Sequence, residues 1–201
     1  MNKYIYTNPT SISTELCLDI IQLFENENSK YHGVTHGGLN KNIKDTMDYV
    51  IPKNDDKWYN IHSFLTKELF KNINIYLNQL NNNNNFKNEN QNTTEIYKFF
   101  NGSKYYIHNF MIQRYIKNEG RYIYHNDFAI NKENTQHRII TYLWYLNDVI
   151  EGGETEFDEF KIQPEQGKLL LFPACWTYPH CGKMPISNNK YIITGWIYID
   201  N

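Results

Sequence analysis

The spacing of the apolar residues changes once along this chain, at about residue 80, and this change constrains the fold more than any other feature. Before it, apolar side chains recur at the three-to-four-residue interval of helices that bury one face. After it, they alternate with polar side chains, as in β-strands. A chain of 201 residues with this pattern is expected to form a single domain, mainly β, with flanking α-helices.

The first part of the chain is expected to contain two helices that pack on a sheet. Ser13 or Thr14 can cap the first helix, whose apolar stripe comprises Leu16, Ile20, Ile21 and Phe24. The second helix should run from about residue 55 to 80, and its apolar stripe comprises Trp58, Ile61, Leu65, Leu69, Ile73 and Leu77. The segment between the helices contains three glycines and a proline, so it is expected to be irregular or short-stranded.

An asparagine-rich segment, residues 81–92, follows the second helix and is expected to be a solvated loop. Strands are expected beyond it at residues 105–107, 110–116, 122–127, 138–146, 168–172 and 190–198. Many short strands separated by turns favour a sandwich or a barrel. The expected organisation is therefore a helical support region (residues 1–80), the loop (81–92) and a β core (93–201).

Charge and hydropathy exclude several classes of partner. The formal net charge is −2, which gives no support to a nucleic-acid partner, since nucleic-acid readers neutralise phosphates with excess basic side chains. No apolar run is long enough for a signal peptide or a membrane span. The protein is therefore expected to be intracellular, in the cytoplasm, with no membrane partner. Three cysteines are too few and too scattered for a disulfide framework.

Two histidines and an aspartate form a candidate metal site. A His-x-Asp motif such as His125-Asn126-Asp127 arises by chance in roughly one chain of this size in five. Residues two apart on a strand project to the same face, however, so His125 and Asp127 can bind one ion together. With His180 they make two imidazoles and one carboxylate, the ligand set of a non-haem Fe(II) site. A Cys/His zinc site around His180 is the alternative, but its cysteines lack CxxC spacing.

A lysine lies ten residues after the third candidate ligand. Lys190 shares a strand face with Thr194 and Trp196, and a lysine on an otherwise apolar inward face needs an anionic partner. The turn-like segment 184–189 would join an antiparallel pair that brings His180 and Lys190 together. Lys190 could then bind the distal carboxylate of a dicarboxylate such as 2-oxoglutarate. The alternative is a lysine in a turn that points to water.

Four segments in the second half resemble the signature of the prolyl 4-hydroxylase-type 2-oxoglutarate/Fe(II) dioxygenases. They are YLNDVIEGGETEF (145–157), GKLLLFP (167–173), WTYPH (176–180) and KYIITGW (190–196). The resemblance extends over about residues 113–200 and implies a double-stranded β-helix. This is a jelly-roll core of the cupin kind, with the N-terminal helices packed on one sheet. It also implies that the protein is an enzyme in a single catalytic domain.

The resemblance assigns roles to individual residues. It makes His125, Asp127 and His180 the iron ligands and Lys190 the partner of the distal carboxylate of 2-oxoglutarate. It places four further residues in the co-substrate pocket: Tyr115, Tyr145, Thr194 and Trp196. Arg138 matches an arginine near the substrate, although a strand-edge arginine in solvent is an equal alternative. The remaining histidines singled out, His32, His36, His62 and His108, lack a ligand-like context and are expected to be structural or surface residues.

The activity implied is hydroxylation of an unactivated C–H bond, with decarboxylation of 2-oxoglutarate to succinate and CO₂. Fe(II), 2-oxoglutarate and O₂ would be required, with ascorbate as a candidate reductant. The expected substrate is a prolyl residue in a peptide or protein, and the alternatives are a free amino acid or a small metabolite. The segment 128–137 is short for a peptide hydroxylase. Two rival classes remain, a non-catalytic jelly-roll binding module and a cupin isomerase that uses another metal.

Overall fold

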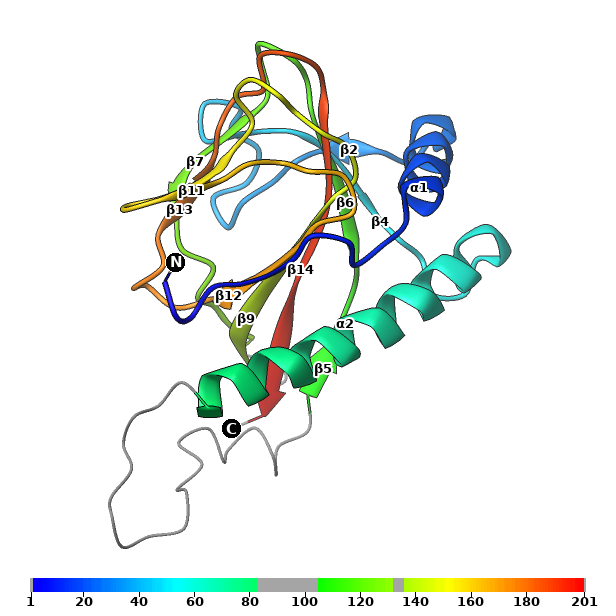
Figure 1. Cartoon of the computed structure of the whole chain (residues 1–201). Coiled ribbons are helices and arrows are strands. Elements are labelled where there is room, and N and C mark those ends of the chain that lie inside the picture. Colours follow the sequence, from blue (N-terminus) through cyan, green and yellow to red (C-terminus); the bar gives the residue numbers. More distant parts are fainter. Residues whose placement is uncertain (1, 83–104, 132–135, 201) are drawn as a thin grey trace, which may run out of the picture.

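The computed structural model describes residues 2–82, 105–131 and 136–200. These residues form three layers: two helices, a nine-stranded sheet and a five-stranded sheet (Figure 1). The larger sheet has the strand order β1-β12-β9-β14-β6-β4-β2, with β5 beside β14 and β8 beside β9, and the smaller sheet has the order β11-β10-β13-β7-β3. Two facing antiparallel sheets with helices on one outer face confirm the predicted mainly-β, jelly-roll fold class.

The strands of the larger sheet are β1 (Tyr6–Asn8), β2 (Tyr31–His32), β4 (Met47–Val50), β5 (Tyr105–Ile107), β6 (Met111–Tyr115), β8 (Ile130–Asn131), β9 (Gln136–Tyr145), β12 (Leu169–Pro173) and β14 (Lys190–Asp200). Those of the smaller sheet are β3 (Lys44–Asp45), β7 (Arg121–His125), β10 (Thr155–Phe157), β11 (Lys161–Ile162) and β13 (His180–Gly182).

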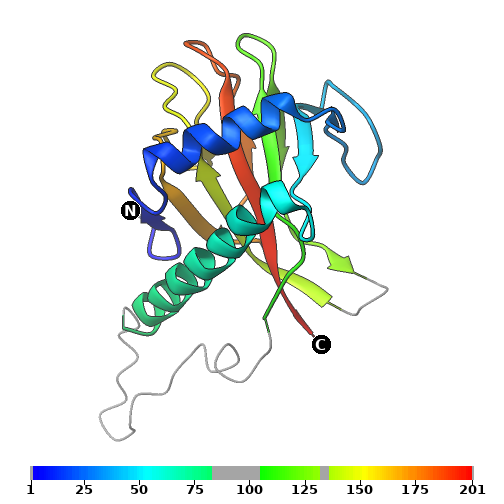
Figure 2. The same ribbon diagram turned by 90° about the vertical axis from the view of Figure 1, so that its right-hand side faces the viewer.

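Both helices lie across the outer face of the larger sheet (Figure 2). Helix α1 (Thr14–Asn26) begins at the cap Ser13, whose hydroxyl accepts a hydrogen bond from the Leu16 amide at 3.2 Å. Helix α2 (Asp56–Asn82) follows the predicted stripe, and Trp58, Leu65 and Leu69 are fully buried on it. The main apolar core therefore lies between the helices and the larger sheet. No helix in the described ranges carries a stretch apolar enough to cross a lipid bilayer.

Strand β14 is the central element of the larger sheet. It pairs with β9 along one side and with β6 and then β5 along the other. Alternation along it divides its side chains between two environments. Ile193 and Ile197 pack into the core beneath the helices, whereas Ile192 belongs to a second, smaller core between the two sheets. The inward face of β14 thus lies between the sheets, where the candidate site is found.

Two expectations about local structure were wrong. Asp127 lies two residues beyond the end of β7, so it does not share that strand with His125. Strands β13 and β14 are not paired, because β13 pairs with β7 and β10 in the other sheet. The sequence pattern also missed the short strands β1, β8, β10, β11 and β13.

The division of the chain at residue 80 does not coincide with a division of the sheets. The segment before it supplies four strands as well as both helices, with β1, β2 and β4 in the larger sheet and β3 in the smaller one. Residues 81 and 82 end helix α2, and the rest of the asparagine-rich segment lies outside the described residues. The assignment of separate regions to 1–80, 81–92 and 93–201 stays a prediction.

Candidate active site

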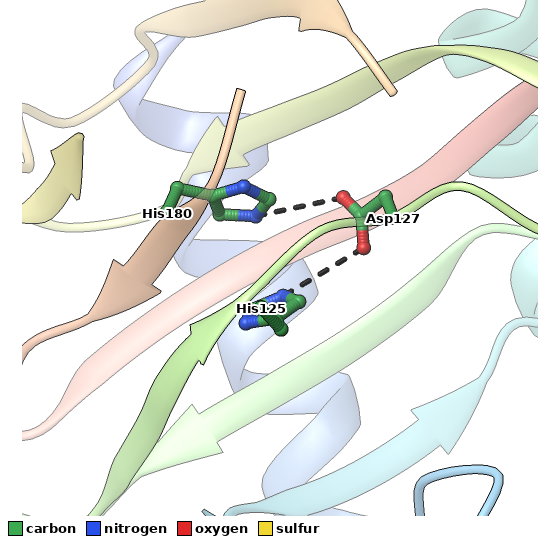
Figure 3. A group of neighbouring side chains, drawn as sticks. All are labelled: His125, Asp127 and His180. Carbon is green, nitrogen blue, oxygen red and sulfur yellow. Dashed lines mark ion pairs between the residues drawn. The ribbon is translucent and has the colours of Figure 1, made fainter. Parts of the chain in front are cut away.

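His125, Asp127 and His180 come together at the inner face of the smaller sheet (Figure 3). His125 ends β7, His180 begins β13, and the two are directly opposite in the register of these strands. The His125 Nε2 atom lies 3.7 Å from Asp127 Oδ1, and the His180 Nε2 atom lies 3.5 Å from Asp127 Oδ2. The candidate ligand atoms of the three residues are all within 4.8 Å of one another.

Hydrogen bonds orient each member of this group. The Nδ1 atom of His125 lies 2.8 Å from the Ile123 carbonyl oxygen, and that of His180 lies 3.0 Å from the Tyr178 carbonyl oxygen. A carbonyl only accepts, so in the neutral rings Nδ1 carries the proton and Nε2 presents a lone pair to the carboxylate. The Thr141 hydroxyl donates to Asp127 Oδ2 at 2.8 Å. This hydrogen bond fixes the carboxylate of Asp127, although Asp127 itself lies outside a strand.

Burial and mutual charge set the protonation of the group. Burial, reinforced by the neighbouring His180, lowers the pKa of His125 to about 4, so this imidazole is neutral at pH 7. Burial alone would raise the pKa of Asp127, but the two imidazoles and the Thr141 hydroxyl hold it below its ordinary value. Neutral imidazole nitrogens beside an ionised carboxylate are the forms that bind a divalent metal.

A cavity of about 330 Å³ extends from this group into the space between the two sheets. Lys190 lines this cavity and is only 1% exposed. Its ammonium donates to the Gly153 carbonyl oxygen at 2.7 Å and lies 4.4 Å from the centre of the Tyr115 ring. Burial lowers the pKa of Lys190 to about 7, which shows how poorly these neutral partners compensate the desolvated charge.

The residues predicted to line a co-substrate pocket do not all reach this cavity. Tyr115, Thr194 and Trp196 line it together with Lys190, but Tyr145 does not. The buried Tyr145 hydroxyl instead donates to Thr155 Oγ at 2.7 Å, and it is Thr155 that lines the cavity. The sequence pattern did not single out Thr155, because its inward position follows from the short strand β10 that the pattern missed.

Arg138 lines the same cavity. Its guanidinium carbon is 3.6 Å from the centre of the Trp196 ring, and its Nε donates to the Tyr198 hydroxyl at 3.1 Å. Among the described residues, stacking on an indole and one hydrogen bond hold the guanidinium in place, and its terminal nitrogens have no acceptor there. Of the two positions considered for it, the structure places this arginine on the cavity wall.

The rim of the cavity contains residues for which the sequence predicted no role in a site. Val34, Thr35 and His36 line it from the loop after β2, so His36 is not merely a surface residue as expected. Phe128 also lines it, and its ring contacts the exposed Trp176 edge-on at a centroid distance of 6.0 Å. Short-range sequence patterns carry no signal for these positions, because their proximity arises from the tertiary fold.

Three of the other histidines lie away from the cavity lining. His32 is exposed in β2, the ring of His62 packs on Phe110 at 5.0 Å, and His108 hydrogen-bonds to Gln136 Oε1 at 2.6 Å. The structural or surface role predicted for these three agrees with their positions.

The donor set fits Fe(II) with a dicarboxylate co-substrate better than a Cys/His zinc site. Within the described ranges, the cluster of possible metal ligands contains two histidines and one aspartate and no cysteine. Such a set leaves coordination positions open for small molecules. The buried ammonium of Lys190 in the same cavity provides the charge that a distal carboxylate needs.

Comparisons with known proteins agree with this geometry. Residues 110–198 match the family model of the 2OG-Fe(II) oxygenase superfamily. Among solved structures, a collagen prolyl hydroxylase of Paramecium bursaria Chlorella virus-1, in complex with 2OG, is 19% identical with a TM-score of 0.63 over 98% of this chain and 97% of that one.

Two further prolyl hydroxylases share the fold. One from Trichoplax adhaerens, in complex with a peptide fragment of the oxygen degradation domain of hypoxia inducible factor, is 18% identical, with a TM-score of 0.64 over 99% of this chain and 84% of that one. A Pseudomonas putida prolyl-4-hydroxylase is 14% identical, with a TM-score of 0.64 over 96% and 91%. No curated protein sequence matches the chain.

Proposed function

We propose that this chain, which belongs to the 2OG-Fe(II) oxygenase superfamily as a dioxygenase of the prolyl 4-hydroxylase type, hydroxylates a prolyl residue of a peptide or protein. One observation carries the proposal. The His125, Asp127 and His180 group and the buried Lys190 line the same cavity. A binding module or an isomerase has no need of a buried, weakly compensated lysine in the same cavity as a metal site.

His125, Asp127 and His180 would hold the Fe(II) ion. The Nδ1 hydrogen bonds to main-chain carbonyls keep both Nε2 lone pairs directed at the ion, and Thr141 keeps the carboxylate in place. When bound, Fe(II) and 2-oxoglutarate supply the oxidising chemistry: O₂ places one oxygen atom in the product and one in succinate, and CO₂ is released. The rest of the site binds, orients and excludes water.

Lys190 and Thr155 would bind the distal carboxylate of 2-oxoglutarate. The Tyr145 hydroxyl donates to Thr155 Oγ, so the proton of Thr155 is free to donate into the cavity, beside the ammonium. A carboxylate there gains a charge-assisted hydrogen bond and a neutral one. Thr194 differs, because its hydroxyl donates to the Tyr142 carbonyl oxygen at 3.0 Å and is already engaged. Its role would be to shape the pocket.

Aromatic and apolar groups at the cavity mouth support a prolyl substrate. Phe128, Trp196 and Val34 provide flat or apolar surface beside the metal group. Arg138, held on Trp196, would donate to a main-chain carbonyl oxygen of the peptide. The solved relatives include a collagen prolyl hydroxylase and a prolyl hydroxylase bound to a peptide, which supports a peptide over a free amino acid.

The test is reconstitution with Fe(II) and 2-oxoglutarate in the presence of a proline-containing peptide library or of free proline. We expect succinate formation and a peptide product that gains one oxygen atom, detected by mass spectrometry. Asp127→Ala should abolish succinate formation, because a carboxylate ligand of the metal is lost. The protein should stay folded, because Asp127 lies in a loop and not in a strand. The matched control, Asp158→Ala, removes an exposed carboxylate from another loop and should retain activity.

Three results would contradict parts of the proposal. Oxidation of free proline alone would replace the substrate class and leave the dioxygenase activity intact. A wild-type protein that neither binds 2-oxoglutarate nor forms succinate would overturn the activity itself. Normal turnover in the Asp127 variant would remove that carboxylate from the metal site.

A further inference from the structure

A buried polar cluster lies on the cavity wall, next to Lys190. It consists of Lys44, Asp48, Gln113 and Tyr115, each at most 4% exposed. The cluster follows the strand register across the sheet: Asp48 of β4 is opposite Gln113 of β6, and Tyr115 of β6 is opposite Lys190 of β14. All four residues line the cavity, and none of the roles proposed above accounts for Asp48 or Gln113.

Asp48 determines which way each hydrogen bond in the cluster runs. Its Oδ2 accepts from Lys44 Nζ at 2.6 Å and from Gln113 Nε2 at 3.3 Å, and its Oδ1 accepts from the Thr46 hydroxyl at 2.7 Å. A carboxylate only accepts, so Gln113 must turn its amide NH₂ toward Asp48. The Gln113 carbonyl oxygen then faces the Tyr115 hydroxyl at 3.2 Å and must accept its proton.

In this arrangement the Tyr115 oxygen presents its lone pairs to the cavity, and its proton points to Gln113. Burial and nearby negative charge raise the pKa of Tyr115 well above its ordinary value, so the phenol keeps its single proton. The hydroxyl lies over β13, since a Cβ atom on Gly182 would be 3.2 Å from it. Tyr115 lines the cavity beside Lys190, whose ammonium lies 4.4 Å from the centre of its ring. The oxygen atoms of a carboxylate bound at Lys190 would therefore lie beside the Tyr115 hydroxyl, where they need a donor.

We propose that Gln113, oriented by Asp48, is a positioning residue that competes with 2-oxoglutarate for the proton of Tyr115 and so weakens co-substrate binding. The inference rests on the proposed function. When 2-oxoglutarate binds, the Tyr115 hydroxyl has two options. It can donate to 2-oxoglutarate, which leaves the Gln113 carbonyl oxygen buried without a donor. Otherwise it keeps its bond to Gln113, and the lone pairs of the Tyr115 oxygen face the oxygen atoms of 2-oxoglutarate. Both outcomes oppose binding, because a buried acceptor without a donor is costly.

The test replaces Gln113 with an apolar side chain of similar length. In Gln113→Met the acceptor is gone, and Asp48 keeps the donors Lys44 and Thr46. We expect the dissociation constant for 2-oxoglutarate to fall by roughly threefold to tenfold, the equivalent of one buried hydrogen bond. The measurement is calorimetric titration of 2-oxoglutarate into Mn(II)-loaded protein without oxygen, alongside thermal unfolding. If the methionine variant does not fold, Gln113→Leu takes its place.

Tyr115→Phe supplies the control, because it removes the proton for which the two groups compete. In the Tyr115→Phe background, adding Gln113→Met should cause no further change in affinity. Unchanged or weaker binding in Gln113→Met alone would overturn the inference, as would an equal gain in both backgrounds, which would indicate a merely structural effect. Wild-type protein that binds no 2-oxoglutarate would overturn the proposed function as well, so the two failures are distinguishable.

Discussion

At the scale of single residues, burial lowers the pKa of two cationic groups in the cavity, with different consequences for binding. It lowers the pKa of His125 to about 4, which keeps the imidazole neutral and ready to bind a metal at pH 7. It lowers the pKa of Lys190 to about 7, so that part of this lysine loses the charge that a carboxylate would need. A bound anion reverses the second effect, because an opposite charge favours the ammonium form.

Binding of 2-oxoglutarate should therefore depend on pH through Lys190. The pKa of this group is about 7 in the free protein and higher in the complex, so binding takes up a proton. The affinity for 2-oxoglutarate should be highest below pH 7. It should fall as the pH rises above 7, by at most about tenfold per pH unit. Calorimetric titrations between pH 6.5 and pH 9, in steps of roughly half a unit, would measure this slope.

Lys190→Arg is the control for that slope, since an arginine stays charged throughout the range. Its affinity should be independent of pH over the same interval. An equal pH dependence in the arginine variant would show that another group causes it. His125 does not interfere, because its pKa of about 4 lies below the range.

At the scale of secondary-structure elements, the loop after β2 is fixed to the barrel by a glycine. The Gly33 amide donates to the Thr46 carbonyl oxygen at 2.9 Å, which brings the loop backbone against the buried pair of Lys44 and Asp48. A Cβ atom at position 33 would lie 2.2 Å from Thr46 Oγ and 2.8 Å from Lys44 Cε. The position of Val34, Thr35 and His36 at the cavity rim follows from this close approach.

Gly33→Ala should therefore destabilise the protein, by about 1–3 kcal/mol in the free energy of unfolding, as for other overpacked sites. Gly37 in the same loop provides the matched control, because a Cβ atom there would meet only Thr35 Oγ, at 3.7 Å. Gly37→Ala should change stability by less than about 0.5 kcal/mol. Urea unfolding of both variants measures the difference, and equal stabilities would show that the loop is not held at position 33.

The sequence predicted where the helices and strands lie along the chain better than it predicted which of them pack side by side. The stripe from Trp58 to Leu77 located α2, and alternation located β9 and β14, because both signals are local. The convergence of candidate ligands was also predicted, but for a partly wrong reason, since Asp127 lies in a loop that Thr141 holds. Thr155 and Gln113 were missed. Their positions depend on strand pairing over long sequence distances, for which a single sequence carries no pattern.

At the scale of the whole molecule, the larger sheet separates the main apolar core from the cavity that holds the candidate site. Its outer face and the two helices form the main core, whereas its inner face borders the cavity. The helices therefore stabilise the sheet from the side opposite to the site. Damage to the main core should lower stability without altering the cavity, as long as the protein remains folded.

Leu65→Ala tests this separation. Leu65 is fully buried on α2, so the truncation should cost about 2–5 kcal/mol in the free energy of unfolding. Leu18→Ala is the matched control, because Leu18 of α1 is 56% exposed and its truncation should cost less than about 1 kcal/mol. Below its melting temperature the Leu65 variant should bind 2-oxoglutarate with unchanged affinity. A large loss of affinity would show that α2 and the cavity are coupled through the sheet.

The placement of the tryptophans gives the protein a natural optical reporter. All four lie in the described part of the chain. Trp58 and Trp144 are sealed in the main core, whereas Trp176 is 70% exposed at the rim and Trp196 lines the cavity beneath Arg138. With Trp176 replaced by phenylalanine, a change in emission on adding a ligand would come from the indole in the cavity. Entry into the site can thus be followed without attaching a dye.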